Sequence, residues 1–379
     1  MLRKSHVWNV ILCGSCALVM TAVSFAASTA SGRGAGTATT APPSYSERAT
    51  YGVQALQGWY VQSSGLYQKP TDWWNSANAI TVLVDYSRAT HSAQYLDAVA
   101  NTFSKASNAY GITNFINDSN DDEGWWALAW IDAYDLTKKP EYLAMAQTIF
   151  ADMTTQWDTT TCGGGVWWSK DLKHSAYKNA ITNELFLDIA ASLANRATHG
   201  PQKAEYLSWA QREWKWFQAS GMINSDNMIN DGLNATNPAA CTNNRQTTWT
   251  YNQGVILGGL VELSRADHDS ALLSKAREIA DATMIKLVTQ AGILKEPPGG
   301  GPDLPQFKGV LMRNLARLNR AAPRVEYKRF ADTNADSIWS NDQGANYKFG
   351  NYWQGPCDSF DGTRQTSALD ALIAAVEMQ

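Results

Sequence analysis

Charge is scarce in this 379-residue chain, and basic residues form no block. Charged side chains make up 17% of the sequence, and the formal net charge is −4 at pH 7. A nucleic-acid-binding protein concentrates Lys and Arg on one surface, so this composition excludes nucleic acid as an expected partner.

Cysteine is also rare, with five residues in all, of which two lie in the first sixteen positions. The other three, Cys162, Cys241 and Cys357, include no CxxC pair and have no histidine cluster beside them, so we predict no bound metal and no cofactor. Three cysteines permit one disulfide and one free thiol. We expect Cys162 to pair with Cys241, because both lie in consecutive long loops.

Long apolar runs are missing after residue 23, so we expect no stable membrane insertion. The N-terminus itself is typical of a secretory signal: Arg3 and Lys4 precede an apolar stretch, and residues 24–26 form a small-x-small cleavage site. A membrane anchor is the alternative, but the apolar stretch is short and interrupted. We predict a signal peptide at 1–26, a disordered leader at 27–43 and one catalytic domain at 44–379, giving a secreted protein of the extracellular space or cell wall.

Tryptophan, by contrast, is abundant, with sixteen residues. Each indole N–H needs a partner when it is buried, so the excess indicates a deep core or aromatic platforms in a groove. Beyond residue 44 the pattern is helical throughout. Some segments are amphipathic, such as 140–157 and 269–288, whereas others, such as 122–137 and 251–266, are apolar on nearly every side.

The two kinds of segment alternate approximately along the chain, which predicts an all-α fold with buried helices inside and amphipathic helices outside. Twelve helices in that order make an (α/α)6 barrel. The predicted helices are 45–60, 71–90, 92–110, 122–137, 140–157, 177–197, 203–220, 251–266, 269–288, 307–320, 324–340 and 367–377.

The links from outer to inner helices are long, whereas the links from inner to outer helices are short. In such a barrel the long links all emerge at one end, above the N-termini of the inner helices. Long loops carry binding and catalytic residues more often than short ones, so we expect the site at this end.

The segment 120–126, Asn-Asp-Asp-Glu-Gly-Trp-Trp, begins one of the inner helices at that end. Helix capping is one interpretation, with Asn120 as N-cap and Glu123 as its capping-box partner. The catalytic interpretation assigns the chemistry to Asp121 and Asp122, since an indole beside a carboxylate suits the apolar face of a sugar. A divalent metal is the weaker alternative, because no second acidic cluster stands at another inner helix.

Other polar and aromatic residues stand at the starts of inner helices, where their amides and hydroxyls suit a hydroxyl-rich ligand. Each residue taken singly is more often a cap or a satisfied buried group, and Asp231 has an Asp-Gly turn as its common explanation. The predicted substrate-binding residues are Trp73, Trp74, Asn75, Trp125, Trp126, Tyr177, Asn179, Asp231, Trp249, Tyr251, Asn252 and Gln253.

Several runs resemble glycoside hydrolase family 76, the endo-α-1,6-mannanases, in the order that the family has them. These runs are NDDEGWWALAWIDAYD (120–135), CGGGVWW (162–168), YKNAITNELFLDIAASLA (177–194), NDGL (230–233), TWTYNQGVILGGLVEL (248–263) and FKGVLMRNLARL (307–318). They cover most of the chain from about residue 45.

The resemblance implies an (α/α)6 fold and hydrolysis of α-1,6-linked mannose in mannan or mannoprotein glycans. It places the family's nucleophile at Asp121 and its acid/base at Asp122. Glu123 stands where the family often has Gln, and its extra charge would affect the pKa values of its neighbours.

Two consecutive carboxylates at a helix start favour a retaining mechanism, because inversion needs a separation of roughly 6.5–9.5 Å to admit a water. A general acid needs a raised pKa, which we assign to Asp122. We expect a monomer with mannan as its partner. The alternatives are a transglycosidase of the same family that acts in cell-wall assembly, and a catalytically silent mannan-binding protein.

Overall fold

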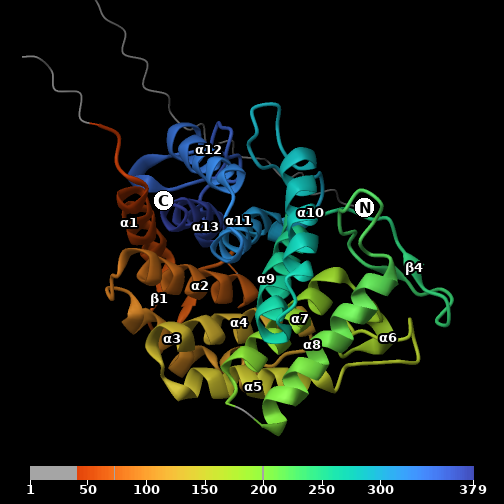
Figure 1. The fold of residues 1–379 in the computed structure, drawn as a ribbon. Helices are drawn as coiled ribbons and strands as arrows, with labels where there is room; N and C mark the ends of the chain where they lie inside the picture. The colour runs from red at the N-terminus through yellow and green to blue at the C-terminus, as the bar shows by residue number, and fades with distance from the viewer. Residues whose placement is uncertain (1–40, 72, 199) are drawn as a thin grey trace, which may run out of the picture.

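The computed structural model describes residues 41–71, 73–198 and 200–379. The predicted signal peptide and most of the predicted leader lie outside the described residues. Figure 1 shows helices winding once around the molecule, in chain order from α1 to α12.

Within the described residues, two very short hairpins accompany the helices. The helices are α1 (Tyr45–Leu56), α2 (Trp73–Thr90), α3 (Leu96–Ala106), α4 (Asn120–Thr137), α5 (Pro140–Thr154), α6 (Leu172–Ser175), α7 (Ala180–Arg196), α8 (Pro201–Ser220), α9 (Thr250–Asp267), α10 (Ala271–Lys286), α11 (Leu304–Ala321), α12 (Val325–Asn341) and α13 (Gly362–Glu377). The antiparallel hairpins pair β1 (Tyr60–Val61) with β2 (Leu66–Tyr67), and β3 (Leu233–Asn234) with β4 (Thr242–Asn243).

Six helices form a closed inner ring. In the order α2, α4, α7, α9, α11 and α13, each packs against the next, and α13 packs back on α2. Apart from the four-residue α6, the other helices, α1, α3, α5, α8, α10 and α12, lie outside this ring (Figure 1). The predicted (α/α)6 barrel is therefore confirmed. Most predicted boundaries differ by a few residues, and α6 was not predicted.

The burial of each helix follows its sequence pattern. Every residue of α7 from Ala180 to Ala194 is buried, whereas α10 buries a single stripe from Leu272 to Thr283. Gly258 on α9 allows close packing of the inner ring, since a Cβ there would lie 2.4 Å from Asn314 Oδ1.

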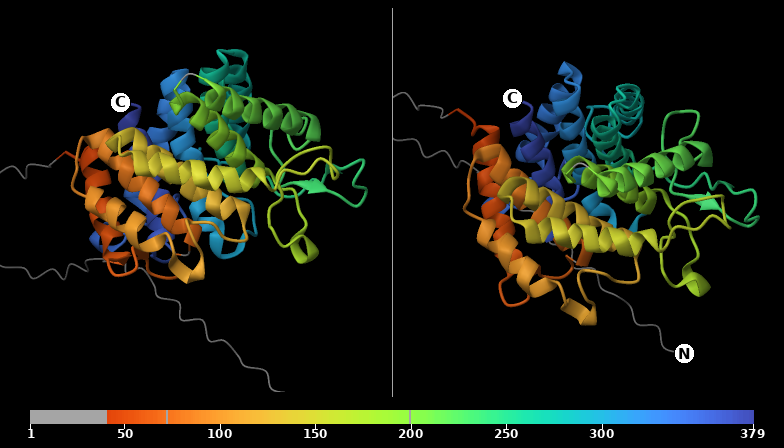
Figure 2. Two further views of the ribbon diagram at one scale, coloured as in Figure 1. Left: turned by 90° about the horizontal axis from the view of Figure 1, so that it is seen from below. Right: turned by 60° about the horizontal axis from the view of Figure 1, so that its bottom comes forward.

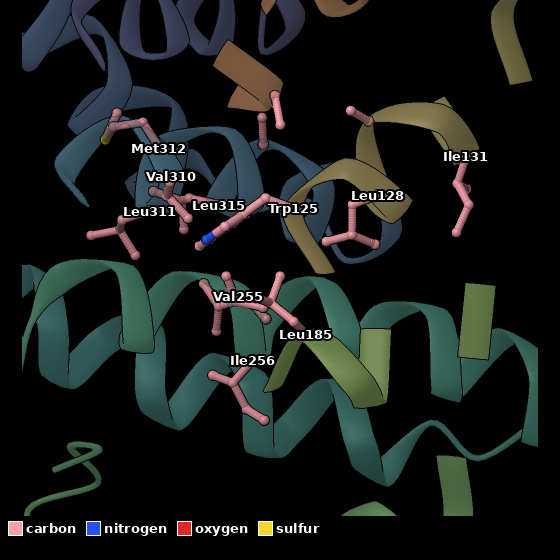
Figure 3. Packing of buried hydrophobic residues seen from close by; sticks show 14 of the residues in the cluster. Trp125, Leu128, Ile131, Leu185, Val255, Ile256, Val310, Leu311, Met312 and Leu315 are labelled. Atoms are coloured by element: carbon pink, nitrogen blue, oxygen red, sulfur yellow. The ribbon is translucent and has the colours of Figure 1, made fainter. Parts of the chain in front are cut away.

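The core of the barrel lies between the inner helices. Figure 3 shows Trp125 and Leu128 of α4 facing Leu185 of α7, Val255 of α9 and Leu315 of α11. Within the part of the chain that the structure describes, no helix combines the length and apolar character needed to cross a bilayer. The segments 122–137 and 251–266, which are apolar on nearly every side, thus belong to the inner-ring helices α4 and α9.

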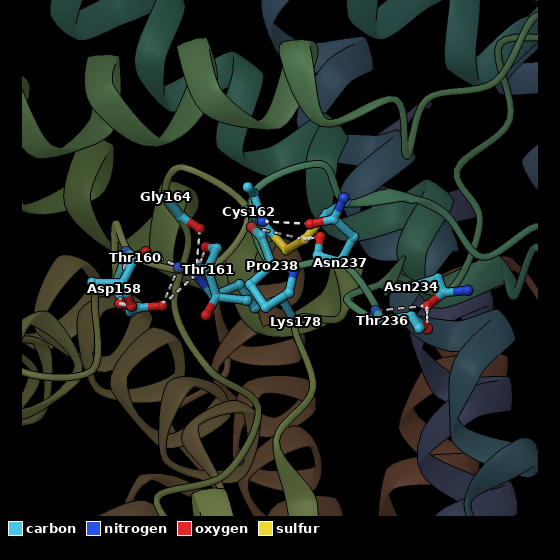
Figure 4. Close-up of a disulfide and its surroundings, with 12 residues drawn as sticks. Asp158, Thr160, Thr161, Cys162, Gly164, Lys178, Asn234, Thr236, Asn237 and Pro238 are labelled. Atoms are coloured by element: carbon cyan, nitrogen blue, oxygen red, sulfur yellow. Dashed lines mark hydrogen bonds and ion pairs between the residues drawn. A yellow bond between two sulfur atoms is a disulfide. The ribbon is translucent and has the colours of Figure 1, made fainter.

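Long loops precede the inner helices, and those carrying α6 and the β3–β4 hairpin extend beyond the barrel (Figure 2). The predicted disulfide between Cys162 and Cys241 is confirmed, with Cα atoms 5.1 Å apart. It joins two of these loops (Figure 4). Cys357 is disulfide-bonded as well, so none of these three cysteines is a free thiol.

Candidate active site

The adjacent carboxylates Asp121 and Asp122 lie in the first turn of α4. Capping does not explain this segment. Ser119, not Asn120, is the N-cap residue, and its side chain makes no capping hydrogen bond. Asn120 is buried, and its Nδ2 donates to Trp167 O at 2.7 Å. The acidic residues are therefore free of a capping-box role.

Asp121 accepts two hydrogen bonds. The indole Nε1 of Trp168 donates to its Oδ2 at 2.9 Å, and the backbone N–H of Asp122 donates to its Oδ1 at 3.0 Å. Burial and the negative charge of Asp122 raise the pKa of Asp121 well above its usual range, while the two donors act in the opposite direction. The pair therefore retains a proton more readily than two separate carboxylates would.

Asp122 is held from the preceding loop. Asn117 Nδ2 donates to Asp122 Oδ2 at 2.9 Å, and the Oδ1 atom of Asn117 accepts from the backbone N–H of Ser119 at 3.0 Å. The asparagine amide is thus bonded at both ends, and its donor faces the carboxylate.

Glu123 is fully buried behind the pair and contacts Lys170 Nζ at 2.9 Å. The same ammonium lies 2.6 Å from Asp152 Oδ2 and donates to Asn117 O at 2.7 Å. Burial raises the pKa of Glu123 to about 9, despite the lowering effect of Lys170. Burial therefore opposes a negative charge on Glu123, whereas Lys170 favours one.

A second hydrogen-bonded group forms at the start of α7. Tyr177 Oη donates to Asp231 Oδ2 at 2.6 Å and accepts from Asn244 Nδ2 at 2.8 Å. Trp249 also donates to Asp231, whose pKa is raised by burial. Gly232 permits this packing, because a Cβ there would lie 2.4 Å from Tyr177 Oη. The structure thus brings three predicted residues together.

Aromatic rings stand at the starts of other inner helices. Trp74 stacks on Trp125 with ring centroids 5.6 Å apart, and its Nε1 donates to Asp303 at 3.2 Å. Tyr251 stacks on Phe307 at 3.9 Å.

Tyr251 is influenced by acidic residues of both groups. Its pKa is raised well above the usual range, first by burial and then by the charges of Asp231, Asp121, Glu184 and Asp303. The negative charges of Asp231 and Asp121, one from each group, therefore both act on Tyr251. This arrangement fits a ligand that offers many hydroxyls and few charges.

Other predicted binding residues lie in the core. Trp126 is 0% exposed, with its ring centroid 4.7 Å from Phe115 and 5.7 Å from Trp130, and Trp73 packs on Trp126 at 5.0 Å. Consecutive residues on a helix point about 100° apart, so one indole of each Trp pair faces the outer helices. In the structure Trp73 and Trp126 therefore pack against other aromatic rings.

The predicted amides are also buried. Gln253 exchanges hydrogen bonds with both backbone groups of Ile229, which fixes the loop before α9. Asn179 caps α7 by accepting from the Thr182 N–H. Asn75 and Asn252 lie in the core as well. Gln253 and Asn179 therefore have structural partners in place of a ligand.

Several residues of the site were not predicted: Asn117, Trp168, Lys170, Asn244, Asp303 and Phe307. Trp168 stands in the run CGGGVWW and Phe307 in FKGV, so both lay within the resembling segments. Asp303 has no sequence signal, since it reaches Trp74 across 229 positions. Within residues 41–71, 73–198 and 200–379, no three His, Cys, Asp or Glu side chains are grouped to hold a metal ion.

A family model described as glycosyl hydrolase family 76 matches residues 40–379. The mannan endo-1,6-α-mannosidase DFG5 of Candida albicans is 26% identical over 361 residues, which covers 86% of this chain and 78% of that protein. The mannan endo-1,6-α-mannosidase DCW1 of Saccharomyces cerevisiae is 24% identical over 339 residues, covering 83% of this chain and 74% of that protein.

Solved structures share the fold. An α-1,6-mannanase of Salegentibacter sp. HEL1_6 superposes with a TM-score of 0.80 at 22% identity, covering 89% of this chain and 100% of that one. That structure is an inactive variant, with two consecutive aspartates replaced, in complex with α-1,6-mannotetrose. The Lin0763 protein of Listeria innocua matches with a TM-score of 0.77 at 26% identity, covering 88% of this chain and 97% of that one.

Proposed function

Because the chain belongs to glycosyl hydrolase family 76, we propose that it hydrolyses α-1,6-mannosidic linkages inside mannan or mannoprotein glycans. The observation that carries this proposal is the Asp121–Asp122 pair, set beside an indole at the loop-bearing end of the barrel. The names of the relatives support the substrate class. The Salegentibacter enzyme supports the assignment of the chemistry to Asp121 and Asp122, since its inactive variant lacks two consecutive aspartates.

In the proposed mechanism Asp121 is the nucleophile. Its carboxylate attacks the anomeric carbon while Asp122 donates a proton to the leaving oxygen, which yields a mannosyl–Asp121 ester and a shortened glycan. Asp122 then removes a proton from water, and the water displaces Asp121 with a second inversion. The two successive inversions give net retention.

The proton of the pair must lie on Asp122 when Asp121 attacks. We assigned the raised pKa to Asp122 from the sequence, whereas the structure without substrate raises the pKa of Asp121. The Trp168 indole and the Asp122 N–H both stabilise a negative charge on Asp121. Under this proposal these donors keep Asp121 ionised, and Asp122 is the partner that holds the proton.

Substrate binding in this proposal combines rings and polar groups. The faces of Trp74, Trp125 and Tyr251 suit the apolar sides of successive sugars. The Tyr177–Asp231 pair offers both a donor and an acceptor to sugar hydroxyls. Action outside the cell on wall polysaccharide agrees with the predicted signal peptide. In this proposal the enzyme acts as a monomer.

The test is proton NMR of unbranched α-1,6-mannan incubated with purified protein, following new reducing ends and their first-formed anomer. Early α-anomer is expected, and Asp121→Asn and Asp122→Asn should each remove the activity by orders of magnitude while melting normally. An early β-anomer, or near-normal turnover in either variant, contradicts the assignment. Longer oligosaccharides without net hydrolysis identify a transglycosidase, and binding without any turnover identifies a silent mannan-binding protein.

A further inference from the structure

A glycosylation sequon, Asn117-Asp118-Ser119, stands immediately before the carboxylate pair. Its asparagine is half-buried, and both ends of its amide are in use: Oδ1 accepts from the Ser119 N–H, and Nδ2 donates to Asp122. The nitrogen that a glycan would modify is therefore the atom that contacts the proposed acid/base.

The loop around Asn117 is fixed by a segment from elsewhere in the chain. Lys170 Nζ donates to Asn117 O at 2.7 Å, and the backbone N–H of Lys170 donates to Asp118 O at 2.9 Å. Lys170 is itself held by Glu123 and Asp152. The position of the Asn117 amide is thus determined by the fold, independently of any ligand.

The second sequon has a different geometry. Asn234 is exposed, and its Oδ1 accepts from the backbone N–H of Thr236 at 2.9 Å, as Figure 4 shows. It lies at the end of β3, on the loop that extends beyond the barrel. No described interaction occupies its Nδ2.

We propose that Asn117 is a positioning residue for Asp122 and not a glycan acceptor. The amide orients the Asp122 carboxyl toward the leaving oxygen and stabilises its charged form after proton transfer. The inference rests on the proposed function, because it assigns Asn117 a role only through Asp122 as acid/base.

Several charged or titratable groups surround this hydrogen bond. Asp121 lies on the same turn of α4, and Glu123, Lys170 and Asp152 lie behind Asn117. A hydrogen bond to a carboxylate favours its charged form. Removing the Asn117 donor should therefore move the alkaline limb of the pH–rate profile to higher pH, by on the order of one pH unit.

The decisive variants are Asn117→Asp and Ser119→Ala. Asn117→Asp keeps the shape and the acceptor for the Ser119 N–H, but it cannot donate to Asp122 when ionised. Ser119→Ala destroys the sequon and keeps both hydrogen bonds, since only the backbone of Ser119 takes part. Both variants are assayed on α-1,6-mannan from pH 4 to 9, with melting curves to verify folding.

We expect Asn117→Asp to lower kcat about 10- to 100-fold, the usual effect of losing a hydrogen bond to a charged group, with KM little changed. Its alkaline limb should move upward, and Ser119→Ala should match the wild type. Mass spectrometry of protein from a secreting eukaryotic host should find Asn117 unmodified.

Normal turnover in Asn117→Asp overturns the inference, as does a glycan on Asn117 in active enzyme. A loss in Ser119→Ala equal to that in Asn117→Asp also overturns it, because the sequon and not the amide would then matter. Failure of the proposed function has a different result: the wild type then releases no reducing ends from α-1,6-mannan, or Asp122→Asn retains activity.

Discussion

Lys178 provides the sharpest test of how the loops are held at the site. Its side chain is 0% exposed, and its Nζ donates to three carbonyl oxygens: Asp158 O at 2.7 Å, Thr161 O at 2.6 Å and Gly164 O at 2.6 Å. It also forms an ion pair with the Asp158 carboxylate at 3.2 Å. Figure 4 shows these partners gathered beside the disulfide at Cys162. The substitution Lys178→Met keeps an unbranched side chain that is one atom shorter, and it removes every one of these bonds.

The expected loss of unfolding free energy comes from the carbonyl and carboxylate oxygens that lose their donor. A buried carbonyl left without a partner costs about 1–3 kcal/mol, and removal of one member of a buried ion pair costs about 3–5 kcal/mol. The two estimates describe the same group, and the loop can relax to admit water, so we expect about 3–5 kcal/mol in total. Unfolding entropy of about 2.1 cal/mol/K per residue converts this loss to a Tm decrease of about 5 °C for a chain of this length.

The assay is thermal unfolding of wild type and variant followed by circular dichroism at one scan rate. Lys173→Met is the matched control, because Lys173 is exposed on α6 a few residues away and should melt within about 1 °C of wild type. A Lys178→Met protein that melts as high as the control would refute the reasoning, since the buried ammonium would then contribute nothing net.

Three further predictions concern single contacts. Trp168→Phe keeps an aromatic ring but loses the hydrogen bond to the proposed nucleophile, so kcat on α-1,6-mannan should fall about 10- to 100-fold with unchanged melting. Gly165→Ala should destabilise the protein by about 1–3 kcal/mol more than Gly163→Ala in urea titrations. Both glycines have positive φ, but only at Gly165 would a Cβ meet the Trp216 ring, at 2.4 Å. Burial raises the pKa of Asp342 to about 7, so its ionisation destabilises the fold between about pH 4 and 7. The unfolding free energy of the wild type should therefore fall as the pH rises through that window, whereas that of Asp342→Asn should not. The difference between the two proteins should grow up to about pH 7 and stay constant above it.

The architecture was predictable because the apolar pattern of each helix indicates which of its faces are buried. A helix that is apolar on every side, such as α7, must be buried on every side. An amphipathic helix such as α10 must pack its apolar face against other helices and leave its polar face in water. The approximate alternation of the two kinds along the chain therefore specifies two rings. Helix ends were less predictable. The structure starts α4 at Asn120 and not at residue 122, because backbone bonds to the loop before α7 fix its first turn.

Most of the predicted residues that lie in the candidate site stand at the starts of inner helices, which begin at one end of the barrel. Asp121, Trp74 and Tyr251 are of this kind, whereas Asp231 was predicted in the long loop between α8 and α9. The orientation of Trp126 was not predictable, because two adjacent indoles cannot face the same way on a helix and the pattern does not say which one faces inward. Its neighbours in space, Phe115 and Trp130, settle the question by enclosing it.

Apart from Phe307 of α11, the residues that sequence reasoning missed lie outside the long helices, and their spacing explains why they were missed. Trp168 reaches Asp121 across 47 positions, and Lys170 reaches Asn117 across 53. No periodic pattern links such positions, because their contact depends on how one loop lies against another. Asn117 is the exception, being five positions from Asp122, and it also stands in a glycosylation sequon. Glycosylation and a hydrogen bond to Asp122 would both use the Nδ2 atom of Asn117, so the sequence motif alone does not distinguish them. The structure does, because this nitrogen points at the Asp122 carboxylate.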